Sequence, residues 1–194
     1  AGDDPPSRDL DKEALAAVAT GRMPALITAN RATDILTVLR LSREFPRMDL
    51  VLSGAAEAHL VLDEIAEAGI PIALHPTMGR AGGESESLAF DTAAKLRARG
   101  IPFAIQSGYE VYVPKTRVVL FEAGVAAAYG LSRQHALEAV TIDAAEILGL
   151  GDRVGSLEVG KDADLVLFDG DPLETVTHVC GVIVDGRVVR EECF

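Results

Sequence analysis

The residues best suited to chemistry stand directly after short apolar runs of the sequence. His75 follows the run 70–74, and Gln106 and Ser107 follow the run 101–105. An imidazole titrates near neutral pH and can bind a transition metal, whereas an amide and a hydroxyl donate and accept hydrogen bonds. A lone histidine without nearby Cys, Asp or Glu is most often a hydrogen-bonded pocket residue. We therefore name His75, Gln106 and Ser107 as candidate pocket residues and assign no catalytic residue.

The sequence contains no catalytic motif of the common nucleophilic or metal-dependent hydrolases. It contains no GxSxG elbow, no HExxH helix and no Cys–His–Asn arrangement. The segment 76–87 carries Gly79, Gly82 and Gly83, which is typical of a mobile or docking loop, but it lacks GxGxxG and a Walker lysine. The remaining histidines are expected in structural or surface positions: His59 and His135 in helices, and His178 in the C-terminal segment.

Four strand-then-helix units position these residues. Apolar runs at 24–28, 50–52, 69–74 and 100–105 predict strands, and amphipathic segments at 35–45, 56–68, 116–129 and 132–148 predict helices. The third and fourth units open with the near-identical phrases GIPIAL and GIPFAI. Nearly continuous apolar runs suit strands that are covered on both faces. They predict a parallel sheet of the TIM-barrel or doubly wound kind.

Composition bounds the class of protein. The chain has 194 residues, 48% of them apolar, a net charge of -12 and a pI near 4.7, which predicts a soluble chain that binds neither nucleic acid nor anionic membrane. No run reaches the ~20 apolar residues of a membrane span. Cys180 and Cys193 lack zinc-site spacing and are expected as a buried thiol and a tail thiol. Ala1 in place of methionine predicts processing or truncation.

The segment 155–169, GSLEVGKDADLVLFD, and the later VIVDGRVV resemble the closing segment of the amidohydrolase superfamily, most closely its imidazolonepropionase-related branch. The resemblance implies metal-dependent hydrolysis of carbon–nitrogen bonds on a TIM barrel. The implied fold is α/β: the C-terminal half of a (β/α)8 barrel, about four βα units, followed by a small β-sandwich segment. Because the resemblance begins at the family's fifth strand, the family's HxH pair and its bridging lysine or glutamate have no counterpart here.

Three positions that the resemblance assigns to metal chemistry are substituted. Asn30 stands where the family's fifth strand ends in histidine, and Gly54, within LSGAAEAH, stands where the sixth ends in histidine. Gly108, in QSG, replaces the family's aspartate, which binds metal and acts as general base. A catalytic zinc needs three protein ligands and a proton acceptor for its water. The substitutions therefore predict that this chain binds no metal by itself.

The resemblance and the composition together predict three parts and a partner. We expect a flexible acidic leader at 1–12, a half TIM-barrel domain at 13–149 and a C-terminal β-sandwich segment at 150–194, in which Asp185 and Gly186 form a hairpin turn. A half barrel exposes strand edges and an apolar inner face. The expected cover is another chain, an N-terminal half that completes the barrel, or a second copy.

Two functions follow. The first is a degenerate, non-catalytic amidohydrolase-like subunit that serves as a structural or interaction component of a larger assembly. The second is the C-terminal half of a hydrolase of amide or imidazolone-type bonds, in which the partner half supplies a site for zinc or a similar divalent metal and this half shapes the pocket with His75 and Gln106.

Overall fold

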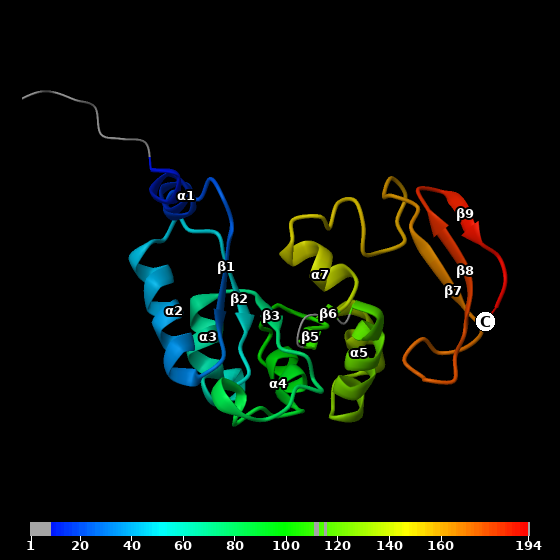
Figure 1. Cartoon of the computed structure of the whole chain (residues 1–194), viewed down its shortest axis with the longest axis horizontal. Coiled ribbons are helices and arrows are strands. Elements are labelled where there is room, and N and C mark those ends of the chain that lie inside the picture. Colours follow the sequence, from blue (N-terminus) through cyan, green and yellow to red (C-terminus); the bar gives the residue numbers. More distant parts are fainter. Residues whose placement is uncertain (1–8, 111–112, 115, 194) are drawn as a thin grey trace, which may run out of the picture.

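The computed structural model describes residues 9–110, 113, 114 and 116–193. A four-stranded parallel sheet, flanked by helices, is followed by a three-stranded antiparallel sheet at the C-terminal end (Figure 1). The expected α/β class, with four βα units and a small C-terminal β segment, is confirmed. In the described part of the chain, no helix combines the length and apolar character needed to cross a membrane.

The parallel sheet contains β1 (Ala25–Ala29), β2 (Leu50–Gly54), β3 (Ile72–Leu74) and β4 (Phe103–Ile105), in that order. Its register places Ala29, Gly54, Leu74 and Ile105 in one row across the four strands. The residues that follow this row must therefore gather at a single edge of the sheet. All five residues of β2 are buried, as expected for a strand covered on both faces, whereas β1 alternates because it lies at the sheet edge.

The repeated GIP phrase has the same structural role twice. Gly69 and Gly100 adopt left-handed φ angles of 65° and 67°, which glycine reaches without steric cost, and each follows the end of a helix. The carbonyl of Pro71 then accepts from the amide of Leu52, and that of Pro102 accepts from the amide of Ile72. Each phrase thus ends one helix and aligns the next strand with its neighbour.

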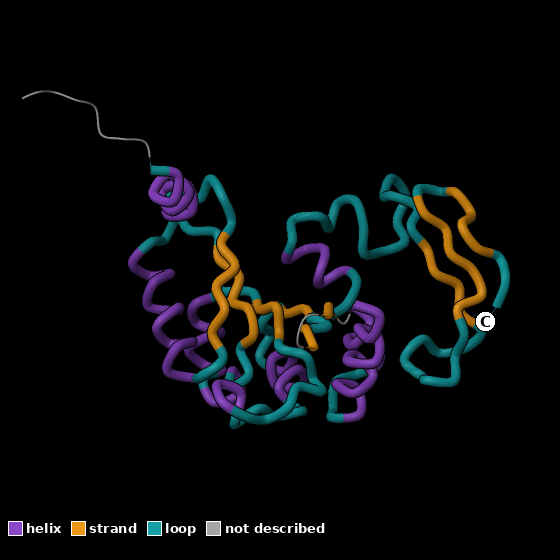
Figure 2. The backbone as a smooth tube through the Cα atoms, in the orientation of Figure 1, coloured by secondary structure: helices purple, strands orange, loops and turns teal. Residues whose placement is uncertain are grey.

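Several helical segments differ from expectation (Figure 2). The helix expected over 132–148 is two helices, separated at Ala139–Thr141. Ser132 caps the first by accepting from the amide of His135. The segment 56–68 likewise divides into a 3₁₀ turn and a helix. The helical elements are α1 (Leu10–Ala19), α2 (Ala32–Glu44), η1 (Ala58–Leu60), α3 (Leu62–Ala68), η2 (Gly83–Ser85), α4 (Thr92–Ala98), η3 (Thr116–Val118), α5 (Val119–Ala128), α6 (Arg133–Glu138) and α7 (Ile142–Ile147).

The leader was expected to be flexible through Lys12, but helix α1 begins at Leu10. Asp9 caps it: its carboxylate accepts from the amide of Lys12 at 3.1 Å. The acidic residues that favoured disorder therefore also supply a helix start, because an aspartate satisfies the free amides of a first turn. The rest of the expected leader, residues 1–8, lies outside the described residues.

The core lies between the sheet and the helices that cover it. Helix α2 contacts β1 and β2, while α4 and α5 contact β4. The largest fully buried side chains are Phe103, Ile35, Leu39, Leu52, Ile65, Ile72, Leu96 and Glu122. Every one of these except Glu122 is apolar, so burial of apolar surface is the main force that holds the sheet against its helices.

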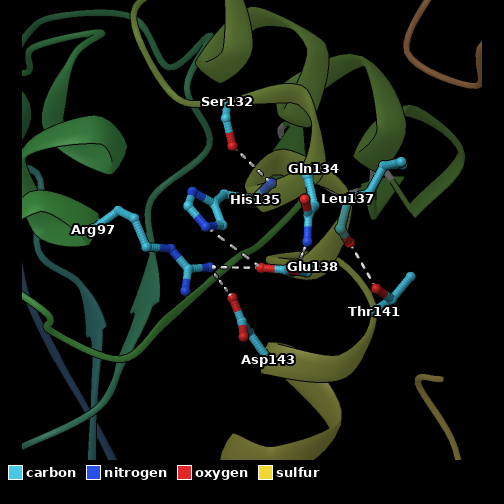
Figure 3. A network of polar contacts seen from close by, with 8 residues as sticks. All are labelled: Arg97, Ser132, Gln134, His135, Leu137, Glu138, Thr141 and Asp143. Atoms are coloured by element: carbon cyan, nitrogen blue, oxygen red, sulfur yellow. Dashed lines mark hydrogen bonds and ion pairs between the residues drawn. The ribbon is translucent and has the colours of Figure 1, made fainter.

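A polar network joins the helices near the amino ends of the strands (Figure 3). Arg97 of α4 forms ion pairs with Asp143 of α7 and, at 3.7 Å, with Glu138 of α6, and its guanidinium lies 5.4 Å from the ring centroid of Phe103. Residues at this end of a barrel serve stability, since active sites form at the opposite end. We therefore assign the network a structural role.

The C-terminal sheet contains β7 (Leu165–Phe168), β8 (Val179–Val184) and β9 (Arg187–Arg190), with the predicted Asp185–Gly186 turn between the last two. Arg133 of α6 forms ion pairs with Asp171 and Glu174, which lie in the connection between β7 and β8. A short hairpin that was not predicted, β5 (Tyr109–Glu110) with β6 (Val113–Pro114), follows β4.

The prediction of two free thiols was wrong. Cys180 and Cys193 form a disulfide that ties the end of the described chain to β8. The separation of 13 residues in sequence concealed their proximity, because the β8–β9 hairpin reverses the chain between them. Disulfides persist mainly in oxidising compartments.

Candidate functional site

The candidate site is a cavity at the carboxyl ends of the parallel strands. It measures about 830 Å³ and is bordered by β1, β2, the loops after β3 and β4, and Glu122 of α5. The six positions named from the sequence all line it: Asn30, Gly54, His75, Gln106, Ser107 and Gly108. The parallel register accounts for this convergence, because residues that directly follow aligned strands share one edge.

His75 continues the sheet beyond β3. Its amide donates to the carbonyl of Gly54 at 2.6 Å, which fixes the backbone at the strand end. Its ring Nδ1 lies 2.9 Å from the carbonyl of Pro76, and because a carbonyl only accepts, Nδ1 carries the hydrogen in the neutral ring. Nε2 then holds the lone pair. Gly79 lies against the ring, where a β-carbon would come within 2.1 Å of Cε1.

The side-chain amide of Gln106 forms hydrogen bonds with other residues of the chain. Nε2 donates to the carbonyl of Ala73 at 2.9 Å and lies 3.4 Å from the hydroxyl oxygen of the buried Ser53. Its own backbone amide donates to Leu74 at 3.1 Å. These bonds connect β4 to β3 and β2 across the inner face of the sheet. Gln106 and Ser53 therefore support the cavity wall by hydrogen bonding.

The side chain of Asn30 lies against the backbone of Gly54, where a β-carbon would otherwise project. The Oδ1 atom of Asn30 is buried without a hydrogen-bond partner among the described residues, and a β-carbon at Gly54 would lie 2.4 Å from it. Gly54 also has a φ of 88°, a left-handed conformation that disfavours other residues. A histidine at this position would therefore require both a backbone change and displacement of Asn30.

Gly108 is similarly enclosed. A β-carbon there would lie 2.5 Å from Cγ of Pro76, and its φ is 68°. Within the described residues, no group of three or more His, Cys, Asp or Glu side chains could hold a metal ion. A neutral amide and two enclosed glycines do not fit the divalent metal that the resemblance to the amidohydrolase superfamily implies.

Glu122 was missed by sequence reasoning. Its side chain is only 2% exposed, and Oε2 accepts from the amide of Met78 at 2.7 Å. Its backbone carbonyl accepts from the Thr77 hydroxyl at 3.1 Å. Glu122 thus holds the loop that follows His75 from the far side of the cavity. A single acid within the apolar run VVLFEAGVAAA was the signal available in the sequence.

The residues Glu57 and His59, which follow Gly54 in the sequence, serve the fold. A carboxylate oxygen of Glu57 accepts from the amide of Ala32 at 2.8 Å, which satisfies a free amide in the first turn of α2. Burial lowers the pKa of His59, and the positive charge of Lys95 lowers it further. His135 lies in α6, and His178 is exposed and pairs with Asp169 at 2.9 Å.

The structure is a parallel β/α half-barrel with a cavity at the carboxyl ends of its strands. Active sites of barrel enzymes form at this face. The sequence signature of the amidohydrolase family matches residues 87–189, more than half of the chain. The chain therefore belongs to the amidohydrolase family.

Individual relatives agree with this assignment. An amidohydrolase structure from Thermotoga maritima MSB8 superposes with a TM-score of 0.88 at 34% identity, over 97% of this chain and 49% of that one. Amidohydrolase tasK of Hapsidospora irregularis is 31% identical over 92% of this chain and 18% of its own length. An imidazolonepropionase of Syntrophobacter fumaroxidans is 36% identical over 62% of this chain and 28% of its own length.

The chain is similar to only part of each relative. It spans about half of the Thermotoga maritima structure and less than a third of these two curated relatives. The imidazolonepropionase similarity agrees with the branch that the C-terminal phrases resemble.

Proposed function

We propose that this chain is a non-catalytic amidohydrolase-family subunit that serves as a structural or interaction component of a larger assembly. One observation carries the proposal: the three strand-end positions assigned to metal chemistry hold Asn30, Gly54 and Gly108, and at the two glycines neighbouring atoms occupy the space that a β-carbon would need. Substitution alone could be compensated by a nearby ligand. Here the ligand positions are substituted, and the space beside the two glycines is also filled. This combination supports a pocket that has adapted to the absence of metal ligands.

The first prediction concerns metal content. Protein purified in its native complex without chelators is expected to contain zinc, iron and manganese far below one equivalent per chain, because the side chains at the strand ends offer no adequate ligand set. Inductively coupled plasma mass spectrometry measures the metal, and intact mass spectrometry of the same sample identifies every chain present. Stoichiometric metal would count against the proposal.

The second candidate is a hydrolase of amide or imidazolone-type bonds that a partner half completes. It is favoured by the convergence of all six predicted positions, together with the buried Glu122, on one cavity. In this case His75 shapes the substrate pocket, with its ring held by the contact of Nδ1 with the carbonyl of Pro76 at 2.9 Å.

His75→Ala separates the two functions. If the complex is a hydrolase, the substitution is expected to abolish hydrolysis measured against amide and imidazolone-type substrates. The matched control is His178→Ala, which removes an exposed imidazole from the C-terminal segment and should leave activity intact. Under the non-catalytic proposal, the unmodified complex already lacks activity, so hydrolysis that depends on His75 would overturn it.

A further inference from the structure

The C-terminal sheet has no apolar core of its own. Among the described residues 150–193, Gly181 is the only one that is buried. Between 46% and 66% of the surface is exposed at five apolar residues on or beside its strands: Val166, Leu167, Val184, Val188 and Val189. A small sheet needs an apolar face packed against another element to be stable by itself. Burial of apolar surface therefore contributes little to holding this sheet together.

The strands of this sheet also pack little against the helices. They lie at one end of the molecule (Figure 1), and their extensive contacts are with one another. A cavity of about 580 Å³ lies between the helices and β7, with Leu137 on the helical side and Leu165 and Phe168 on the other. The ion pairs that Arg133 forms with the β7–β8 connection join exposed side chains, and such pairs add little stability.

The disulfide closes the open end of the β8–β9 hairpin. The turn at Asp185–Gly186 joins the two strands at one end, and their pairing stops at Val182 and Arg190 at the other. Cys180 and Cys193 lie just beyond that end. A crosslink between residues 13 apart restricts the opened chain enough to change a local opening equilibrium on the order of a hundredfold. The disulfide is therefore a major constraint on the order of the sheet.

This crosslink is accessible to a reductant. Cys193 is exposed, and Cys180 is only partly buried. Exposed disulfides are reduced more readily than those enclosed in a core. The bond that holds the hairpin closed is thus one that the redox conditions around the protein can break and re-form.

The parallel sheet does not depend on this bond. Its side chains Ile35, Leu52 and Phe103 are almost completely buried in a single continuous core. Among the described residues, the buried part of that core includes none after Ala139. Opening of the C-terminal sheet therefore removes no buried residue from the core of the parallel sheet.

We propose that the Cys180–Cys193 disulfide is a redox switch that controls the order of the C-terminal sheet. In the oxidised chain, β7, β8 and β9 pair as described. In the reduced chain they lose this order, while the parallel sheet stays folded on its own core. The switch goes beyond the proposed role as an interaction component, because it sets the redox conditions under which the C-terminal surface exists.

The chemical step is thiol–disulfide exchange with a dithiol reductant. A thiolate of the reductant attacks one sulfur, which breaks the bond between Cys180 and Cys193 and forms a mixed disulfide. The second thiolate of the reductant then displaces the remaining cysteine. The reductant is oxidised to a disulfide and supplies two electrons and two protons, and the two cysteines become thiols.

Hydrogen exchange of the whole chain, followed by mass spectrometry before and after treatment with dithiothreitol, tests the switch. Exchange at the amides of β8 and β9 should quicken on the order of a hundredfold after reduction, whereas exchange in β2 and β3 should stay the same. Alkylation of free thiols in the same samples reports the state of the bond. Re-oxidation with glutathione disulfide should restore the protection.

The double variant Cys180→Ser, Cys193→Ser separates the bond from other actions of the reductant. It should show the fast exchange in β8 and β9 without any reductant, and dithiothreitol should have no further effect on it. Four results would overturn the inference: a bond that dithiothreitol leaves intact, unchanged protection in the reduced chain, loss of protection in β2 and β3 as well, or no recovery on re-oxidation. Metal content is measured separately, so none of these results decides the non-catalytic proposal.

Discussion

Gly108→Ala is expected to lower the free energy of unfolding by about 3 kcal/mol, since a left-handed alanine costs roughly 1–2 kcal/mol and overpacking a similar amount. The φ of Gly108 is 68°, and the new β-carbon would lie 2.5 Å from Cγ of Pro76, an atom of a rigid ring. Urea denaturation of the full chain, followed by circular dichroism, measures the change.

Two further variants isolate the cause. Gly82→Ala is the matched control, because Gly82 has an extended φ of 161° and no atom within 4 Å of the position that an added methyl group would take, so its stability should be unchanged or slightly higher. Adding Pro76→Ala to Gly108→Ala should recover the steric part of the loss and leave the part due to backbone conformation. Equal stability of Gly108→Ala and Gly82→Ala would show that the site has not closed around the glycine.

This result bears on the proposed function, because the family resemblance predicts an aspartate at the position of Gly108. If even the methyl group of alanine destabilises the protein at position 108, then an aspartate there would require the loop after β4 to move. Gly54 faces the same difficulty, since Asn30 and a φ of 88° oppose any side chain. Loss of stability at both positions would support the proposal that this pocket has adapted to the substituted ligand positions.

The sequence sufficed for the elements whose signals are local. Apolar runs located the four strands, and the GIP phrases located two helix ends, because a left-handed glycine and a proline act on their own neighbours. Since parallel strands share one carboxyl edge, the clustering of His75 and Gln106 could also be predicted. A pattern in one sequence predicts structure well when that structure depends on a few residues that are near one another in the chain.

Features that depend on distant contacts were not predictable in the same way. The disulfide depends on a hairpin that brings Cys180 and Cys193 together. The inward turn of Gln106 depends on the carbonyl of Ala73 in a neighbouring strand. The extent of α1 depends on a cap whose aspartate, read as composition alone, indicated disorder. In each case a specific partner, rather than composition, decides the outcome.

Glu122 is the clearest of these cases and yields the second large effect. Glu122→Ala is expected to lower the free energy of unfolding by about 3 kcal/mol, because it combines a cavity in the core with an unsatisfied amide at Met78. Denaturation measures the loss. Hydrogen exchange should show faster opening of the loop that follows His75, since the glutamate accepts from that loop.

Glu122→Gln is the matched control, because its amide oxygen can still accept from Met78 in a side chain of nearly equal size. It should keep most of the stability and the loop protection. A buried carboxylate beside a barrel cavity would otherwise suggest a general base, but a base needs a negative charge, whereas this hydrogen bond needs only an acceptor. If Gln is as damaging as Ala, the charge itself is required, and Glu122 becomes a candidate catalytic group in a partner-completed hydrolase. If Gln substitutes well, the acid holds the loop in place, as expected of a non-catalytic subunit.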